Sequence, residues 1–389
     1  MQLAERMYRL GTESAFETGA RARALEAQGR KIIHLEIGEP DFDTPPHIVE
    51  AACAALRAGH THYTPPEGIA PLREAIAADL SATRGHEIDP RQVVITPGAK
   101  PIMFFVLLAL AEPGVEVIYP NPGFPIYESM INFCGATPVP LPLREAFDFR
   151  FDIDEFRSLI SDRTRLIILN SPQNPTGGYL QRQELAAIAE VCAERNIMVL
   201  ADEIYEHILY EGEFASLTTL PGMSTHERTI ILHGFSKSYA MTGWRLGFGV
   251  MPLNLAEHIK RLVINSNSCT SASNQYAGLA ALQGSQQCVR DMVAEFRRRR
   301  DVIVEGLNAI PGITCRKPLG AFYVFPNITG TGMTSHECAD FLMHEAGVAC
   351  LSGRSFGVHG EGHVRMSYAN SVENIQQALV QISEALARR

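Results

Sequence analysis

One lysine and one arginine lie close together after a predicted strand. Lys237 and Arg245 lie in the segment HGFSKSYAMTGWR, directly after the apolar run at residues 229–232. That run predicts a buried strand, so Lys237 lies where the strand ends and the chain turns. A lysine amine can form a Schiff base with a carbonyl, and an arginine nearby can bind an anion. Together they indicate an aldehyde that carries a phosphate, and pyridoxal phosphate has this chemistry.

Other predicted strand ends carry side chains that suit the same cofactor. The segment TPGAK follows the run at 93–95, and its small residues let backbone N–H groups approach a phosphate. Phe124 can stack on a pyridine ring, Asn174 can donate to a phenolate oxygen, and Tyr205 can reach that oxygen too. Asp202 can pair with a protonated ring nitrogen. Taken singly, these residues also fit a tight turn, a core aromatic or a helix cap.

The elements that must position these residues alternate along the chain. Short apolar runs are separated by helical stretches, at residues 93–95, 115–118, 166–169, 198–200, 229–232 and 246–250. Continuous apolar strands between helices predict an α/β fold with a mostly parallel sheet covered on both faces. A helix is expected over residues 1–30, and others are expected after Gly68, at about 286–309 and after Ser371. We predict a large domain at residues 45–285 and a smaller α+β domain at 1–44 and 286–389.

Composition restricts the classes of partner. The 389 residues are 46% apolar and 20% charged, as in globular proteins, and the net charge of −9 argues against general attraction to nucleic acid or anionic membranes. The basic run at 297–300 lies within a helical apolar pattern and predicts a solvated helix face. The eight scattered cysteines predict reduced thiols, and His60 and His62 lack a third metal ligand, so no metal is expected. Because no signal-peptide core or membrane-length apolar run occurs, we expect a soluble, cytoplasmic protein.

Several stretches together resemble fold-type I pyridoxal-phosphate enzymes, specifically class I aminotransferases of the aspartate aminotransferase type. The two most diagnostic are SPQNPTG at 171–177 and SKSYAMTGWRLG at 236–247; EIGEPDF at 36–42, HY at 62–63 and HVRMS at 363–367 match as well. The resemblance extends from about residue 30 to 370. It implies a seven-stranded type of sheet, a homodimer with shared active sites, and amino-group transfer between an L-amino acid and a 2-oxo acid.

The resemblance also implies a role for each matched residue. Lys237 would hold the cofactor as a Schiff base and move the proton at the substrate α-carbon, while Asp202 would bind the pyridine nitrogen and Phe124 would stack. The other groups are Asn174 and Tyr205 for the ring oxygen; the backbone of Gly98, Ala99 and Lys100 with Ser236 and Arg245 for the phosphate; Tyr63 for the phosphate of the neighbouring subunit; and Gly38, Asn174 and Arg365 for the substrate α-carboxylate. Pro101 and Phe124 depart from the family, where glutamine often follows the loop lysine and Trp or Tyr often stacks.

Alternative functions use the same cofactor residues. A lyase, synthase or racemase of fold-type I also acts at the amino-acid α-carbon, so the cofactor site does not separate it from an aminotransferase. Arg365 together with a proton-shuttling lysine favours transamination. A non-catalytic regulator would be expected to lose Lys237 or to carry a fused DNA-binding segment, and neither is seen. A nicotinamide-dependent oxidoreductase is disfavoured because no complete GxGxxG motif occurs.

Overall fold

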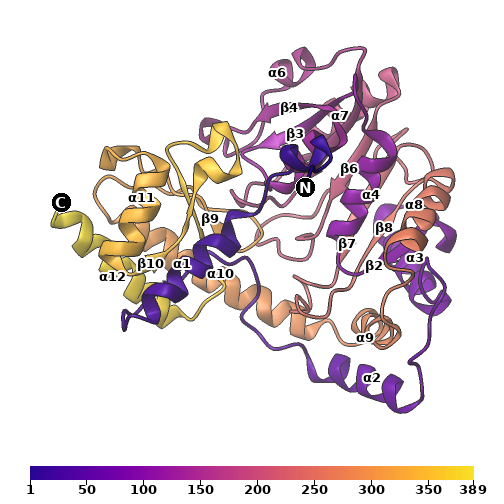
Figure 1. Cartoon of the computed structure of the whole chain (residues 1–389), viewed down its shortest axis with the longest axis horizontal. Helices are drawn as coiled ribbons and strands as arrows, with labels where there is room; N and C mark the ends of the chain where they lie inside the picture. Colours follow the sequence, from indigo (N-terminus) through magenta and orange to yellow (C-terminus); the bar gives the residue numbers. More distant parts are fainter.

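The computed structural model describes residues 1–389, and its centre is a seven-stranded sheet (Figure 1). All neighbouring strands are parallel except around β8, which runs antiparallel to both of its neighbours. This confirms the predicted α/β fold with a mostly parallel sheet. In spatial order the strands are β2 (Val93–Thr96), β8 (Gly247–Val250), β7 (Thr229–Gly234), β6 (Met198–Asp202), β5 (Thr164–Asn170), β3 (Glu116–Asn121) and β4 (Thr137–Pro142).

The edge strand β4 was not predicted from the sequence. Its residues Thr137–Pro142 read TPVPLP, and a proline cannot donate a ladder hydrogen bond. β4 pairs with a neighbour on one side alone, namely β3. The positions at which its prolines lack an N–H group can therefore face the side that has no partner strand.

Helices cover both faces of the sheet because side chains alternate along each strand (Figure 1). On β5, Leu166 and Ile168 join the hydrophobic cluster formed with α4 (Lys100–Leu110), α5 (Ile126–Cys134) and α8 (Leu253–Ser266). The intervening Ile167 and Leu169 join the cluster on the other face, with α6 (Ile153–Ser158) and α7 (Arg182–Arg195). At the β2 end of that face the covering helices are α3 (Ala70–Arg84) and α9 (Ala272–Gln283), with α2 (Pro46–Arg57) packed on α9.

A separate hydrophobic cluster forms the core of the smaller region. It combines side chains of α10 (Gln287–Asn308) and α12 (Val372–Ala387) with the small sheets. Residues 204–210, which follow β6 of the central sheet, also pack into this cluster. The segment after β6 therefore connects the core of the smaller region to the central sheet. The division into a large domain at residues 45–285 and a smaller domain at residues 1–44 and 286–389 stays a prediction. The other elements here are α1 (Ser14–Glu26), β1 (Ile33–His34), β9 (Tyr323–Val324), α11 (Ser335–Phe341), β10 (Val348–Ala349), β11 (Leu351–Ser352) and β12 (Val364–Ser367).

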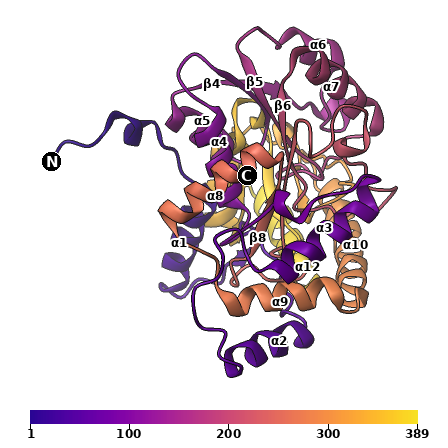
Figure 2. The same ribbon diagram turned by 90° about the vertical axis from the view of Figure 1, so that its right-hand side faces the viewer.

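The chain before α1 does not form the helix expected there. It contains the short 3₁₀ helix η1 (Glu5–Arg9), while α1 accounts for the later part of the predicted segment. Figure 2 shows this segment at the periphery of the molecule, where η1 lies beside α5. Its apolar side chains are exposed, among them Leu3, Met7 and Tyr8. The segment therefore lacks the buried apolar face that stabilises a helix in a globular protein.

The basic run on α10 is only half solvated, so the expectation of a solvated helix face was wrong. Arg299 pairs with Asp41 at 2.6 Å, and the buried Arg300 pairs with Asp301 at 2.9 Å and lies over the Tyr210 ring. Successive helical residues are turned by about 100°, so four in a row cannot all face water on a packed helix.

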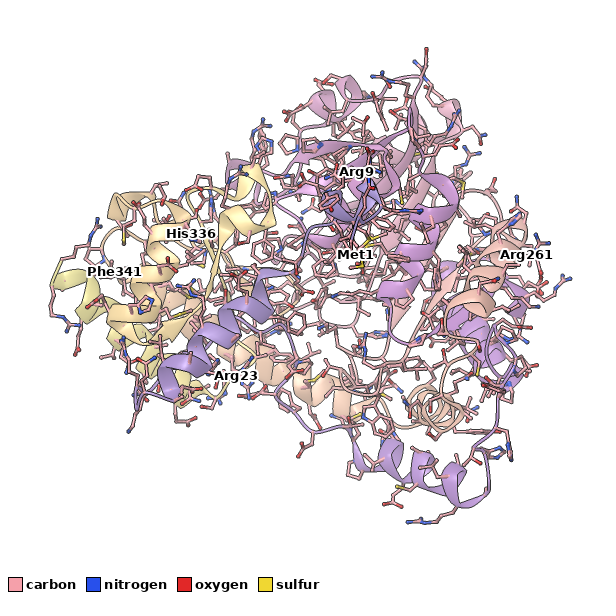
Figure 3. The ribbon with its side chains drawn as sticks, in the orientation of Figure 1. Met1, Arg9, Arg23, Arg261, His336 and Phe341 are labelled. Carbon is pink, nitrogen blue, oxygen red and sulfur yellow. The ribbon has the colours of Figure 1, made fainter.

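Many other ionisable side chains lie on the outer surface of both regions, such as Arg261 on α8 and His336 on α11 (Figure 3). No helix combines the length and the apolar character that crossing a membrane requires.

Candidate active site

A cavity of about 520 Å³ lies beyond the carboxyl ends of the parallel strands. This is the edge at which open α/β sheets bind ligands. Asp202 ends β6 and Lys237 follows β7, while Arg365 on β12 contributes from the smaller region. The predicted residues that line the cavity are Gly38, Ala99, Lys100, Phe124, Asn174, Asp202, Tyr205, Ser236, Lys237, Arg245 and Arg365.

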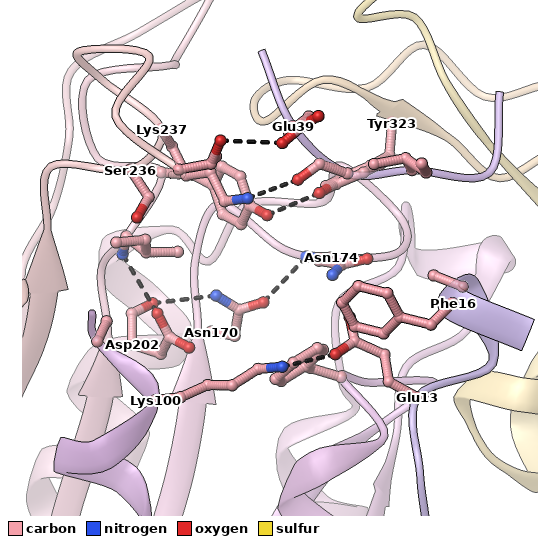
Figure 4. A pocket seen from close by; sticks show the side chains of 18 of the residues that line it. Glu13, Phe16, Glu39, Lys100, Asn170, Asn174, Asp202, Ser236, Lys237 and Tyr323 are labelled. Atoms are coloured by element: carbon pink, nitrogen blue, oxygen red, sulfur yellow. Dashed lines mark hydrogen bonds and ion pairs between the residues drawn. The ribbon is translucent and has the colours of Figure 1, made fainter. Parts of the chain in front are cut away.

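The amine of Lys237 lies inside this cavity (Figure 4). Its Nζ donates a hydrogen bond to the carbonyl oxygen of Gly38 at 2.5 Å. Burial lowers the pKa of Lys237 to about 8, although the carboxylates of Glu13 and Glu39 act in the opposite direction. A lower pKa raises the share of neutral amine near neutral pH, and the neutral amine is the form that attacks a carbonyl.

A buried carboxylate forms another part of the cavity. Asp202 Oδ2 accepts a hydrogen bond from the Tyr127 hydroxyl at 2.5 Å, and Oδ1 accepts one from the Ile204 N–H at 3.3 Å. Asn170 donates to the Asp202 carbonyl oxygen at 3.1 Å. Burial raises the pKa of Asp202 to about 6, while the Tyr127 hydrogen bond opposes this shift. The carboxylate can therefore pair strongly with a cation, because water screens it little.

Tyr127 was missed from the sequence. Burial raises its pKa well above the usual value, so the hydroxyl keeps its proton and remains a donor to Asp202. Its only sequence signal is its place shortly after Phe124, on the first turn of α5, where any buried aromatic would look the same. In the structure the two rings meet edge to face, with centroids 5.6 Å apart.

The corner between β2 and α4 has the geometry of an anion site. Gly98 has a φ of +87°, and a Cβ atom there would lie 2.2 Å from Arg245 Nη2. Glycine is thus needed both for the backbone conformation and for the approach of the guanidinium. Ala99 precedes the N-terminus of α4, whose free N–H groups attract an anion. With Ser236 beside them, these groups fit the phosphate of a phosphorylated aldehyde.

Arg365 is held flat within the cavity wall. Its Nη1 donates to Asn174 Oδ1 at 3.1 Å, and its Nη2 donates to the Glu36 carbonyl oxygen. The guanidinium lies 4.6 Å from the centre of the Tyr323 ring. The Arg365 Nε atom is buried and has no hydrogen-bond acceptor within the protein. A buried donor without a partner is costly, so this guanidinium is suited to a carboxylate ligand.

Two tyrosines that share a hydrogen bond also line the cavity. The hydroxyls of Tyr205 and Tyr323 are 2.8 Å apart, and burial raises the pKa of Tyr205 well above its usual value. Tyr205 was predicted, whereas Tyr323 was read only as part of a strand. A Cβ atom on Gly38 would lie 2.2 Å from the Tyr323 hydroxyl, so Gly38 leaves the room that this hydroxyl occupies.

Two predicted residues do not line the cavity. Gly98 is not part of the lining, although the Arg245 guanidinium lies close against it, as described above. Tyr63 lies outside the cavity, and 90% of its surface is exposed. It lines a separate surface groove with neighbours such as His60 and Ser271. Within one chain, Tyr63 therefore does not reach the phosphate corner.

The sequence and the fold are similar to those of known proteins. Residues 30–382 match the family model "Aminotransferase class I and II". The chain is 40% identical over 369 residues to the aspartate aminotransferase of Pyrococcus abyssi, with 94% of each chain covered. It is also 40% identical over 368 residues to aromatic-amino-acid aminotransferase 2 of Thermococcus litoralis, covering 93% of this chain and 94% of that one.

A solved structure shows the same architecture. The aspartate aminotransferase from Thermus thermophilus with maleate superposes with a TM-score of 0.93 at 36% identity, covering 99% of this chain and 100% of that one. Fold and site thus define an aminotransferase, an enzyme that moves an amino group between an amino acid and a 2-oxo acid. The chain belongs to the aminotransferase class I and II family.

Proposed function

We propose that this aminotransferase works with pyridoxal phosphate held in the cavity and with Lys237 as its catalytic residue. The observation that carries the proposal is the arrangement of charges in that cavity. A buried amine of lowered pKa shares the cavity with a buried carboxylate, Asp202, and with two arginines, Arg245 and Arg365, that could each bind an anion. Each charged part of the cofactor and of the substrate would thus have one protein group that binds it.

The residues present fit this cofactor group by group. When bound, the cofactor supplies an aldehyde that condenses with amines and a ring that withdraws electrons from the substrate α-carbon. Asp202 would hold the ring nitrogen, and Tyr127 fixes the direction of its carboxylate. The other assignments are Asn174 and Tyr205 for the ring oxygen, Phe124 for the ring face, and the backbone of Gly98, Ala99 and Lys100 with Ser236 and Arg245 for the phosphate.

The catalytic step assigned to this chain is a proton transfer. The neutral amine of Lys237 would accept the proton from the substrate α-carbon and would deliver it to carbon 4′ of the cofactor, and this move of the proton is what distinguishes amino transfer from return to the starting amino acid. Arg365 binds the substrate α-carboxylate through parallel hydrogen bonds, with Asn174 and Gly38 beside it. These contacts orient the α-carbon toward Lys237 and keep water out of the site. The named relatives are aminotransferases, so they do not support a lyase, synthase or racemase.

We propose further that the active unit is a homodimer and that Tyr63 completes the phosphate corner of the neighbouring subunit. Its support is the exposure of Tyr63 outside the cavity of its own chain, on a segment stiffened by Pro65 and Pro66. A two-fold interface would make the exchange reciprocal. The cytoplasmic location expected from the sequence also stays a prediction.

The test of Lys237 is chemical trapping. Borohydride treatment of the purified protein with pyridoxal phosphate should attach the cofactor to Lys237, as read by peptide mass spectrometry. Lys237→Ala should lose turnover by several orders of magnitude and still bind the cofactor through Asp202 and Arg245. Lys31→Ala, at an exposed position outside the cavity, is the matched control. Near-normal turnover by Lys237→Ala would refute the assignment.

A further inference from the structure

One ion pair in the cavity has no task in the proposed reaction. Lys100 Nζ lies 2.6 Å from a carboxylate oxygen of Glu13, and both residues line the cavity (Figure 4). Glu13 comes from the segment just before α1, whereas Lys100 begins α4. The α-carboxylate, the ring nitrogen and the phosphate are already provided for by other residues. The wall around this pair is therefore left for the substrate side chain.

The charge of the cavity lining that has no assigned ligand sums to zero. Besides the pair, the cavity lining with no assigned ligand contains one further acid, Glu39, and one further base, Arg23. Glu39 accepts a hydrogen bond from Thr242 at 2.9 Å. Since each positive charge is matched by a negative one, a second carboxylate on the substrate would find no excess positive charge there. To pair with Lys100 it would have to displace Glu13.

The same wall presents apolar surface. Phe16 projects from the first turn of α1 into the cavity beside Glu13 (Figure 4), and 74% of its surface is exposed. Phe124 also lies close to Lys100, whose Nζ is 5.2 Å from the ring centre. An exposed phenyl ring gains free energy when an apolar group covers it.

We propose that Glu13, by neutralising Lys100, makes this enzyme select amino acids with uncharged, apolar side chains over those with a second carboxylate. This inference rests on the proposed function. Glu13 is then a specificity-determining residue, and Phe16 is the surface on which the selected side chain packs. The pair is only partly buried, with 24% of the Glu13 side chain and 46% of the Lys100 side chain exposed, so a moderate effect is expected.

Equilibrium binding of two unreactive analogues to the cofactor-loaded protein tests this selection. Maleate carries two carboxylates, whereas 3-phenylpropanoate carries one carboxylate and a ring. Calorimetry should show tighter binding of 3-phenylpropanoate by the unaltered protein. Glu13→Gln frees Lys100, so the Kd for maleate should fall about fivefold, while that for 3-phenylpropanoate stays the same. The double variant Glu13→Gln, Lys100→Met should lose the gain.

A matched variant separates a local effect from a general one. Glu17→Gln removes the same charge from the first turn of α1, at an exposed position that does not line the cavity. It should leave both Kd values unchanged. The inference is overturned if the unaltered protein prefers maleate, if Glu13→Gln does not change the ratio, or if Glu17→Gln changes it equally. Binding of neither analogue would refute the proposed function itself, and the inference with it.

Discussion

The titration of Lys237 is the sharpest quantitative consequence of the site geometry. Burial among protein atoms disfavours the charged ammonium form and lowers the pKa from 10.5 to about 8. The positive charges of Arg365 and Lys100 act in the same direction, whereas Glu13 and Glu39 oppose it. We therefore expect the amine to lose its proton at a lower pH than other lysines do.

The size of the effect follows from the two pKa values. At pH 7.5 a lysine with a pKa of about 8 is roughly one quarter neutral, whereas one with a pKa of 10.5 is neutral to about 0.1%. If the neutral amine is the reacting form, Lys237 should react about 200-fold faster than a lysine of ordinary pKa and equal access. The advantage should shrink as the pH rises toward 10.5, because the ordinary lysine then becomes neutral too.

The assay is reductive methylation of the cofactor-free protein with formaldehyde and cyanoborohydride. Short exposures at pH 6.5 to 10, followed by digestion and mass spectrometry, give the rate at each lysine. The other lysines in the same digest serve as internal controls. The Lys237 rate should reach half its plateau near pH 8. A Lys237 rate that still rises steeply up to pH 10, as for a lysine with a pKa of 10.5, would refute the reasoning, because burial would then have no effect on this amine.

Three further predictions concern other parts of the site. Arg365→Lys should raise the KM for both amino and 2-oxo acids by about tenfold or more with cofactor binding little changed, because an ammonium cannot form two parallel hydrogen bonds; loss of cofactor at unchanged KM would instead make Arg365 structural. The hydrogen bond from Tyr127 lowers the pKa of Asp202 and so opposes the effect of burial. Tyr127→Phe removes this hydrogen bond. The carboxylate should then protonate at a higher pH, so cofactor affinity, measured by absorbance titration between pH 5 and 8, should begin to fall at a higher pH than in the unaltered protein; superimposable pH profiles would contradict this role. A mixture of Tyr63→Ala and Lys237→Ala subunits should regain activity through hybrid dimers that contain one complete site, and no recovery despite demonstrated subunit exchange would mean that Tyr63 serves its own chain.

Much of the fold and site was predictable because strand and site residue are adjacent in the chain. Lys237 follows the apolar run of β7, and Asp202 ends β6. Parallel strands bring their carboxyl ends to one edge of the sheet, so recognising the strands already places these residues near one another. The apolar runs also predicted the alternating strands and helices, because burial on both faces requires continuous apolar sequence.

The partners of these residues were decided by tertiary packing. Tyr127 donates to Asp202 across 75 positions of sequence, because α5 packs against the sheet in one particular register. The sequence alone leaves open which of several buried groups receives the Tyr127 hydroxyl. The pairing of Glu13 with Lys100 is likewise a contact over 87 positions between separate elements.

The amino-acid sequence by itself determined which side chains are available for chemistry and at which strand end each one emerges. Only the tertiary structure decided the pKa of Lys237, the burial of Arg299 and Arg300 on α10, and the neutral charge of the substrate wall. Each of these depends on how many protein atoms replace water around a group and on which distant charges come close. Both quantities arise when helices and sheets pack, whereas spacing along the chain specifies only local neighbours.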